Sequence, residues 1–174
     1  MTSTYKTVPF GYEPPPASRK GTLVFYDSFE HITDEQLERA AQLAESRSFQ
    51  QLVLYPLHES TVKRWSKEEV RPYYKREDRL HGWRVEHNDS SIKVEGLEGK
   101  RKKYTPMDTA LRHLTDLYPA PIFLILTTDM ANRFASFDSF EEWIKRLRII
   151  IDGSPETVHP RLEQFRNRWE WAEP

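Results

Sequence analysis

Residues 22–55 read TLVFYDSFEHITDEQLERAAQLAESRSFQQLVLY and give the clearest indication of the fold. The stretch opens with a short apolar run, 22–26, and closes with another, 51–55; both have the length and composition of a buried strand. Between the two runs, apolar residues recur at helical spacing, which predicts a helix over about 35–46 with Asp34 as its cap. Buried strands joined by a helix are typical of a parallel sheet that is covered by helices on both faces.

The alternation of strand and helix continues through the rest of the chain. We therefore predict an α/β fold with three layers and a mostly parallel sheet, in which ligands bind beyond the carboxyl ends of the strands. The further expected elements are two helices within the charged stretch 60–88, broken near Pro72; a strand at 91–95; a basic loop at 96–103; a helix at 105–118, capped by Thr105, with Leu111, Leu114 and Leu117 facing inward; a strand at 121–126; a helix near 140–147; a strand at 148–151; and a last helix at 160–171.

The composition narrows the possible classes of protein. The chain has 174 residues, with 26 Lys and Arg against 27 Asp and Glu, and it contains no cysteine. This length predicts one domain, residues 22–174, preceded by a proline-containing arm at 1–21. The lack of cysteine excludes disulfides, Cys-ligated metal sites and thiol catalysis. The net charge of -1 argues against a protein that binds nucleic acid through a basic charge spread over its whole surface. Without a long apolar run or a signal core, we expect a cytoplasmic protein with no membrane partner.

Several segments resemble one family in their order and spacing. Residues 104–111, YTPMDTAL, are similar to a segment written S-Y-T-x-D-T-L, and 123–130, FLILTTDM, to one written F-x-I-G-A-D-x-L. Residues 54–58 resemble a V-P-x-x-x-P-P-H-K region, and 78–83 an H-R-L-x-M-L helix. The family is that of the nicotinate or nicotinamide mononucleotide adenylyltransferases, within the nucleotidylyltransferase superfamily, and the resemblance covers about residues 22–152. It implies a Rossmann-like fold and, in an active member, the joining of ATP to a pyridine mononucleotide with Mg²⁺ and the release of pyrophosphate.

The loop after the first strand departs from the family pattern where catalysis would depend on it. The family has G-G-T-F-D-P-I-H-x-G-H-L; this chain has YDSFEHITDEQL at 26–37, aligned without a gap. Thr33 and Gln36 stand in place of the two histidines that would donate hydrogen bonds to the triphosphate, and they are our candidate catalytic residues. Glu35 stands in place of a glycine, where its charge would repel ATP but suits the first turn of a helix. The loop therefore looks repurposed for helix capping.

Other positions of the family motifs supply candidate ligand contacts. For each, an ordinary structural role is the alternative: a loop histidine, an ion-paired arginine, or a helix cap in the case of Thr105. We expect no protein-built metal site, because His81 and His87 lack the spacing of paired ligands. The second signature of the family, I-S-S-T-x-x-R, has no counterpart near the C-terminus. The candidate nucleotide-binding residues are Ser28, Phe29, His31, His58, Arg79, Tyr104, Thr105, Asp108 and Asp129.

Two charged stretches are explained by ordinary exposed surface, without a ligand. Residues 100–103, KRKK, form the strongest basic cluster and are typical of a solvated loop, although they could attract phosphates or nucleic acid. Residues 68–79 alternate in sign, which predicts an exposed, salt-bridged helix that includes Arg76. We do not expect a nucleic-acid partner.

The sequence leaves two hypotheses for function. The altered motifs favour a catalytically degenerate relative that acts as a nucleotide- or protein-binding module. The alternative is an active, divergent adenylyltransferase that converts ATP and a pyridine mononucleotide to a dinucleotide and uses Mg²⁺. Release of pyrophosphate separates the two hypotheses.

Overall fold

The computed structural model describes residues 19–172, so most of the arm predicted at 1–21 lies outside the described residues. Strands and helices alternate along the chain, as the sequence predicted. In order, the elements are β1 (Thr22–Asp27), α1 (Asp34–Ser46), β2 (Gln51–Pro56), α2 (Glu59–Val62), α3 (Tyr73–His87), β3 (Ile92–Val94), α4 (Leu97–Arg101), α5 (Met107–Leu117), β4 (Ile122–Thr127), α6 (Thr128–Ala135), α7 (Phe140–Ile144), β5 (Arg148–Asp152), α8 (Pro160–Gln164), a 3₁₀ turn (Arg166–Arg168) and β6 (Trp169–Trp171).

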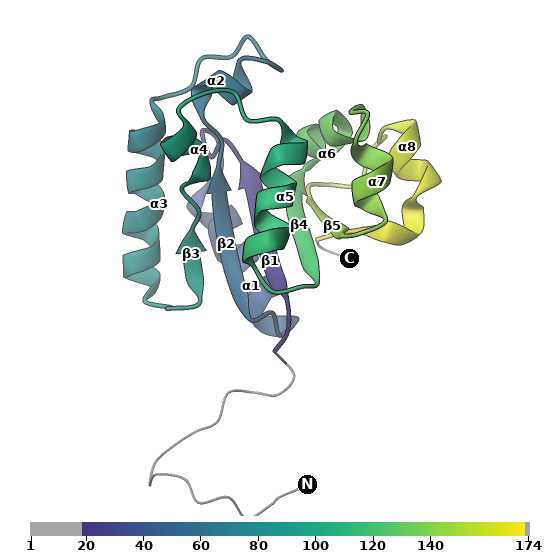
Figure 1. Ribbon diagram of the computed structural model, residues 1–174. Helices are drawn as coiled ribbons and strands as arrows, with labels where there is room; N and C mark the ends of the chain where they lie inside the picture. The colour runs from purple at the N-terminus through teal and green to yellow at the C-terminus, as the bar shows by residue number, and fades with distance from the viewer. Residues whose placement is uncertain (1–18, 173–174) are drawn as a thin grey trace, which may run out of the picture.

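The strands form one sheet in the order β3-β2-β1-β4-β5-β6, and every neighbouring pair is parallel. From β1 the chain builds outward through β2 and β3, then returns to the other side of β1 with β4, and continues outward through β5 and β6 (Figure 1). This arrangement confirms the predicted Rossmann-like α/β fold. It places the point where the strand order reverses between β1 and β4.

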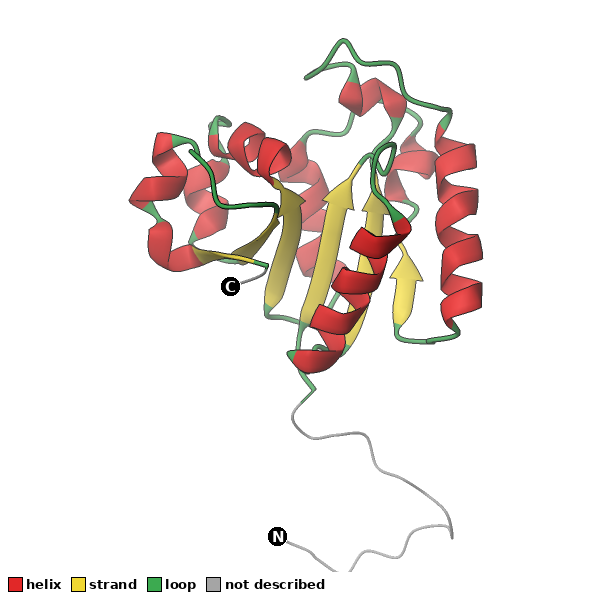
Figure 2. Cartoon of the chain, turned by 180° about the vertical axis from the view of Figure 1, so that it is seen from behind, coloured by secondary structure: helices red, strands yellow, loops and turns green. Residues whose placement is uncertain are grey.

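Helices cover both faces of the sheet, because successive residues of each buried strand point to opposite faces (Figure 2). Val24 and Tyr26 of β1 pack in the cluster that includes residues of α5, α6, α7 and α8. Leu23 and Phe25 pack in the second cluster, which includes residues of α1 and α3. The strands therefore consist of continuous apolar residues rather than alternating ones.

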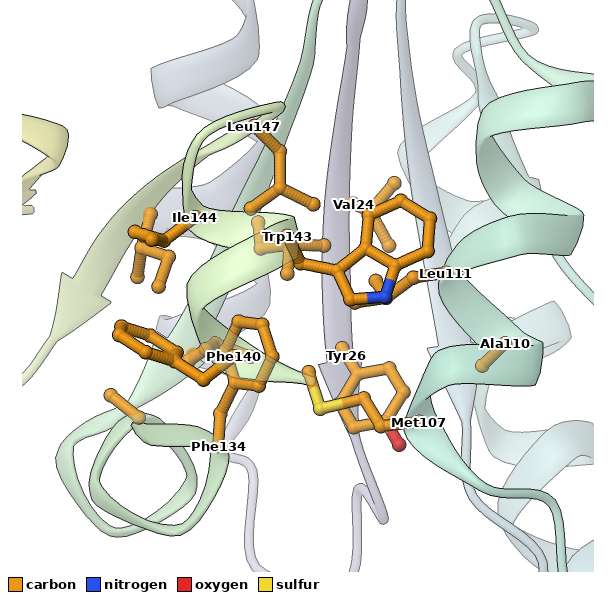
Figure 3. Packing of buried hydrophobic residues seen from close by; sticks show 14 of the residues in the cluster. Val24, Tyr26, Met107, Ala110, Leu111, Phe134, Phe140, Trp143, Ile144 and Leu147 are labelled. Carbon is orange, nitrogen blue, oxygen red and sulfur yellow. The ribbon is translucent and has the colours of Figure 1, made fainter. Parts of the chain in front are cut away.

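Trp143 of α7 is the largest side chain of the first cluster that is completely buried. Figure 3 shows its ring among Val24 of β1 and Leu111 of α5. Its indole N–H donates a hydrogen bond to Asp108 of α5 at 2.7 Å, which links the helices on this face.

Two predicted elements were wrong, and one element was missed. Residues 96–103 contain the short helix α4 instead of a loop, because Glu98 is buried and bonded to β2 and α2. The expected helix at 160–171 ends at Gln164, and Trp169 and Trp171 continue as a sixth strand beside β5. Helix α6, directly after β4, was missed.

Details of the helix ends also differ from the predictions. Thr33, not Asp34, caps α1. Pro106, not Thr105, precedes α5, and Leu117 of that helix is exposed instead of facing inward. Arg76, predicted on an exposed helix face, is completely buried.

No helix among residues 19–172 is long and apolar enough to cross a membrane.

Candidate functional site

A cleft of about 400 Å³ lies where the strand order reverses, at the carboxyl ends of β1 and β4. Parallel α/β sheets usually bind their ligands at this position. We call it the β1/β4 cleft. It brings together four of the residues predicted from the sequence, Ser28, His31, Gln36 and Asp129. The other residues that line it are Asp27, Ile32, Leu57, Val62, Trp65, Ser66, Glu68, Thr127, Met130 and Arg133.

Asp27 ends β1 and shapes the first loop of the cleft. Its carboxylate accepts a hydrogen bond from the backbone N–H of Phe29 at 2.8 Å. This bond supports a turn in which Phe29, a buried aromatic residue, has a φ of 64°, in the left-handed region that bulky residues rarely adopt. Burial raises the pKa of Asp27 from 3.8 to about 6, although bonds from Phe29 and Ser28 oppose that increase.

The two candidate catalytic residues hold the start of α1. The Thr33 hydroxyl accepts a hydrogen bond from the backbone N–H of Gln36 at 3.2 Å, and the Gln36 side-chain oxygen accepts one from the Thr33 N–H at 2.9 Å. This reciprocal pair is a capping box. The Gln36 amide N–H₂ donates to Asp152, at the end of β5, at 2.9 Å. Both side chains thus already have partners within the protein.

The Glu35 side chain does not line the cleft. It is exposed in the first turn of α1, and the cleft is lined by Asp27, Glu68 and Asp129 instead. The carboxylates that line the cleft are therefore these three, and not Glu35, at which the sequence predicted repulsion of ATP.

The basic side chains near the cleft are engaged in contacts. His31 lies 2.6 Å from Glu68, so this histidine is paired with a carboxylate. Arg133 of α6 donates to the backbone carbonyl of Trp65 at 2.8 Å, and its guanidinium lies 5.8 Å from the centre of the Trp65 ring. Trp65 forms an aromatic wall of the cleft. The sequence did not single out Trp65 or Arg133, because they reach the cleft from segments that only the topology brings together.

Two predicted residues maintain the loops around the site. The Nδ1 atom of His58 accepts a hydrogen bond from the Ser60 N–H at 3.0 Å and so caps α2. Arg79 of α3 donates to the Ile32 carbonyl and to Asp34, both at 2.7 Å.

The strongest family motif lies outside the β1/β4 cleft. Thr105 is buried, and its N–H donates to the Thr61 hydroxyl at 3.0 Å. Asp108 accepts from the Trp143 indole, and this bond, with a further one from Arg112, holds its pKa below the ordinary value. Tyr104 lies under the guanidinium of Arg64, 4.0 Å from ring centre to carbon.

Buried Arg76 ties together the loops after β1 and β2. Its guanidinium donates to the Ser28 carbonyl at 2.7 Å and to the Leu57 carbonyl at 2.6 Å, and it pairs with Glu59 at 3.3 Å. Desolvation lowers its pKa, and the nearby carboxylates oppose that effect. The hydrogen bonds of Arg76 therefore connect α3 to the loops that border the cleft.

Metal-ligating side chains do not cluster in the described part of the chain. Among the described residues, no group of three or more His, Cys, Asp or Glu side chains is placed to hold a metal ion.

Comparison with known proteins supports the fold. No family model matches the sequence, and no curated protein matches it. A Plasmodium falciparum nicotinic acid mononucleotide adenylyltransferase, solved in complex with NaAD, superposes with a TM-score of 0.62 at 16% identity, over 87% of this chain and 74% of that chain. A Vibrio parahaemolyticus protein, provisionally assigned as a nicotinate-nucleotide adenylyltransferase, superposes with a TM-score of 0.57 at 19% identity, over 84% of this chain and 85% of that chain. This chain therefore has the fold of these proteins.

Proposed function

We propose that this chain is a catalytically degenerate relative of the nicotinate mononucleotide adenylyltransferases that binds a nucleoside-type ligand in the β1/β4 cleft. The observation that carries the proposal is the capping box of α1. Thr33 and Gln36 occupy the positions of the family's two histidines, and their side chains bond to each other's backbone and to Asp152. The part of the loop that would hold a triphosphate instead stabilises a helix.

The charge of the cleft supports the same conclusion. Adenylyl transfer requires donors and cations around the phosphates, because the protein acts mainly by positioning them and stabilising their charge. Here Asp27, Glu68 and Asp129 line the cleft. Two like charges 4 Å apart repel by about 4 kcal/mol at an effective dielectric constant near 20. A triphosphate in this cleft would therefore be destabilised.

The same residues suit an uncharged ligand with hydrogen-bond donors. Trp65 offers an aromatic face, and the exposed carboxylate of Asp129 can accept bonds from amino or hydroxyl groups. A nucleoside has both an aromatic base and ribose hydroxyls.

An assay for pyrophosphate tests the catalytic part of the proposal. Purified protein is incubated with ATP, Mg²⁺ and either nicotinate or nicotinamide mononucleotide. We expect neither pyrophosphate nor dinucleotide above a no-protein control. Product that disappears in the Thr33→Ala/Gln36→Ala double variant would establish the alternative, an active divergent adenylyltransferase.

Calorimetry tests the binding part. We expect adenosine to bind more tightly than ATP, and Trp65→Ala to weaken adenosine binding at least ten-fold. Trp171→Ala serves as the control, because Trp171 belongs to the edge strand β6 and does not line the cleft. If neither adenosine nor ATP binds, the nucleoside proposal is wrong and a protein-binding role replaces it.

A further inference from the structure

A second cavity, of about 490 Å³, lies between α2, α3 and α4, beyond the carboxyl ends of β2 and β3. We call it the α3/α4 pocket. It shares no lining residue with the β1/β4 cleft, so a ligand here is independent of the proposed function. Its volume falls within the range of about 300–1,000 Å³ that is usual for ligand sites. The residues that line it are His58, Glu59, Pro72, Tyr73, Tyr74, Glu77, Gly96, Gly99, Lys100 and Lys102.

The pocket is built on a buried carboxylate. Glu98 of α4 is completely buried and accepts hydrogen bonds from the Tyr55 and Thr61 hydroxyls, both at 2.7 Å, and from the His58 N–H at 2.8 Å. These bonds fasten α4 to β2 and α2. Gly99 packs directly against the Tyr73 ring, where a Cβ atom would overlap it. The walls of the pocket are therefore preformed.

The same connections gather cations from two separate segments. The Thr105 N–H donates to the Thr61 hydroxyl at 3.0 Å, and Arg64 stacks on Tyr104. The connection from α4 to α5 thus runs beside α2 at the carboxyl end of the sheet (Figure 1). We call the exposed cations of these two connected segments, 61–67 and 100–105, the basic rim. The basic rim consists of Lys63, Arg64, Lys67, Lys100, Lys102 and Lys103.

None of the basic rim residues takes part in an ion pair with another residue of the described range 19–172. Elsewhere in that range, arginines such as Arg19, Arg39 and Arg47 are paired with carboxylates. Exposed lysines elsewhere, such as Lys20 and Lys145, also have no ion pair within that range. The basic rim differs from them because its six cations lie on two short segments, 61–67 and 100–105, that contact each other.

The pocket distinguishes among possible anionic partners. Tyr74, 60% exposed, presents a ring at its mouth. Glu59 is paired with Arg76, whereas Glu77 has only a 3.5 Å contact with the Tyr73 hydroxyl and is available as an acceptor. A carboxylate in the pocket would repel any anionic group placed there, whether a peptide carboxylate, a lipid phosphate or a nucleotide phosphate, so the pocket suits an uncharged group. The carboxylate would accept hydrogen bonds from a base amino group or a ribose hydroxyl.

We propose that the α3/α4 pocket and the basic rim bind single-stranded nucleic acid. One nucleotide base stacks on Tyr74 at the pocket, and the phosphates on either side of that base contact the basic rim. Aromatic platforms next to a positively charged track are the usual means of binding single strands without strict sequence preference.

Fluorescence anisotropy with labelled 12-nucleotide single-stranded RNA and DNA tests the proposal on the full chain. We expect binding that weakens with salt, because each neutralised phosphate contributes a slope of about -0.7 in log K against log salt for single strands. The Lys100→Gln/Lys102→Gln variant is expected to weaken binding about ten-fold and to reduce the steepness of that slope by about 1.4. The matched control is Lys20→Gln/Lys145→Gln, which removes the same charge from exposed lysines outside the basic rim and is expected to bind like the parent.

A second pair of variants tests the stacking. Tyr74→Ala is expected to weaken binding about ten-fold with no change in the salt slope. Val85→Ala, exposed on the same helix, is expected to have no effect. Three results would overturn the proposal: no binding of either oligonucleotide at about 50 mM salt, equal losses in the two lysine pairs, or a polyglutamate peptide that binds as tightly as the oligonucleotides. The last would assign the surface to an acidic protein partner.

Discussion

Asp27 is one of the groups through which pH changes the charge of the β1/β4 cleft. It ends the central strand β1, and burial raises its pKa from 3.8 to about 6. The hydrogen bonds from Phe29 and Ser28, and the nearby His31, favour the charged form but do not cancel the effect of burial. Since the folded protein holds the proton more tightly than the unfolded chain, ionisation of Asp27 destabilises the fold.

The raised pKa of Asp27 gives a testable pH dependence. Asp27→Asn keeps an oxygen that can accept the bond from Phe29 but never ionises. We expect its advantage in free energy of unfolding over the parent to be constant below about pH 4, to grow between about pH 4 and 6, and to level off above. The growth is on the order of 3 kcal/mol, from about 1.4 kcal/mol per pKa unit. Urea denaturation from about pH 3.5 to 8 measures it.

The matched control is Asp116→Asn, because Asp116 is exposed. It should show no such growth. An Asp27→Asn advantage that stays constant across the pH range would mean that the carboxyl of Asp27 ionises as easily in the folded protein as in the unfolded chain.

Among the helices, α1 begins with a capping box formed by Thr33 and Gln36. The capping box satisfies backbone N–H groups that would otherwise be available to a ligand at the helix N-terminus. We expect Thr33→Ala to lower the free energy of unfolding by about 1 kcal/mol. Thr33→Ser, which keeps the hydroxyl, should lose only a small fraction of that. Urea denaturation of both variants checks the prediction, and equal losses would show that the methyl group, not the cap, is responsible.

The sequence predicted most elements because their signals are local. The apolar runs of β1, β2 and β4 and the helical periodicity of α1 need no tertiary information. Helix α4 was missed because it is held by the buried side chain of Glu98. From the sequence alone, a glutamate is expected to be exposed to solvent. β6 was missed even though Trp169 and Trp171 alternate with Glu170 at strand spacing, because the segment is short and comes directly after a helical pattern.

The site was predicted less completely, because it depends on the arrangement of the whole sheet. Ser28, His31, Gln36 and Asp129 line the cleft, and the sequence singled them out because each follows or lies near a strand end in a recognisable motif. Trp65 and Arg133 could not be placed there without knowing that β4 returns beside β1.

The sixth strand allows a test of whether the whole molecule unfolds as one unit. Trp169 is buried, and its indole N–H donates to the Leu162 carbonyl at 2.7 Å. Helix α1 reaches the same region, because Arg47, directly after the helix, pairs with Glu170 at 2.9 Å and Arg39 of the helix pairs with Asp152 at 3.2 Å. Loss of packing at β6 should therefore also weaken the attachment of α1.

We expect Trp169→Ala to lower the free energy of unfolding by about 3–5 kcal/mol, because it removes a large buried side chain. Trp171→Ala, at a half-buried position of the same strand, should cost clearly less. Hydrogen exchange should show faster exchange in β6 and in α1 of Trp169→Ala, with β1 and β4 exchanging only through global unfolding. Faster exchange confined to β6 would mean that the edge strand opens alone. The ion pairs from the α1 region would then not couple the opening of β6 to that of α1.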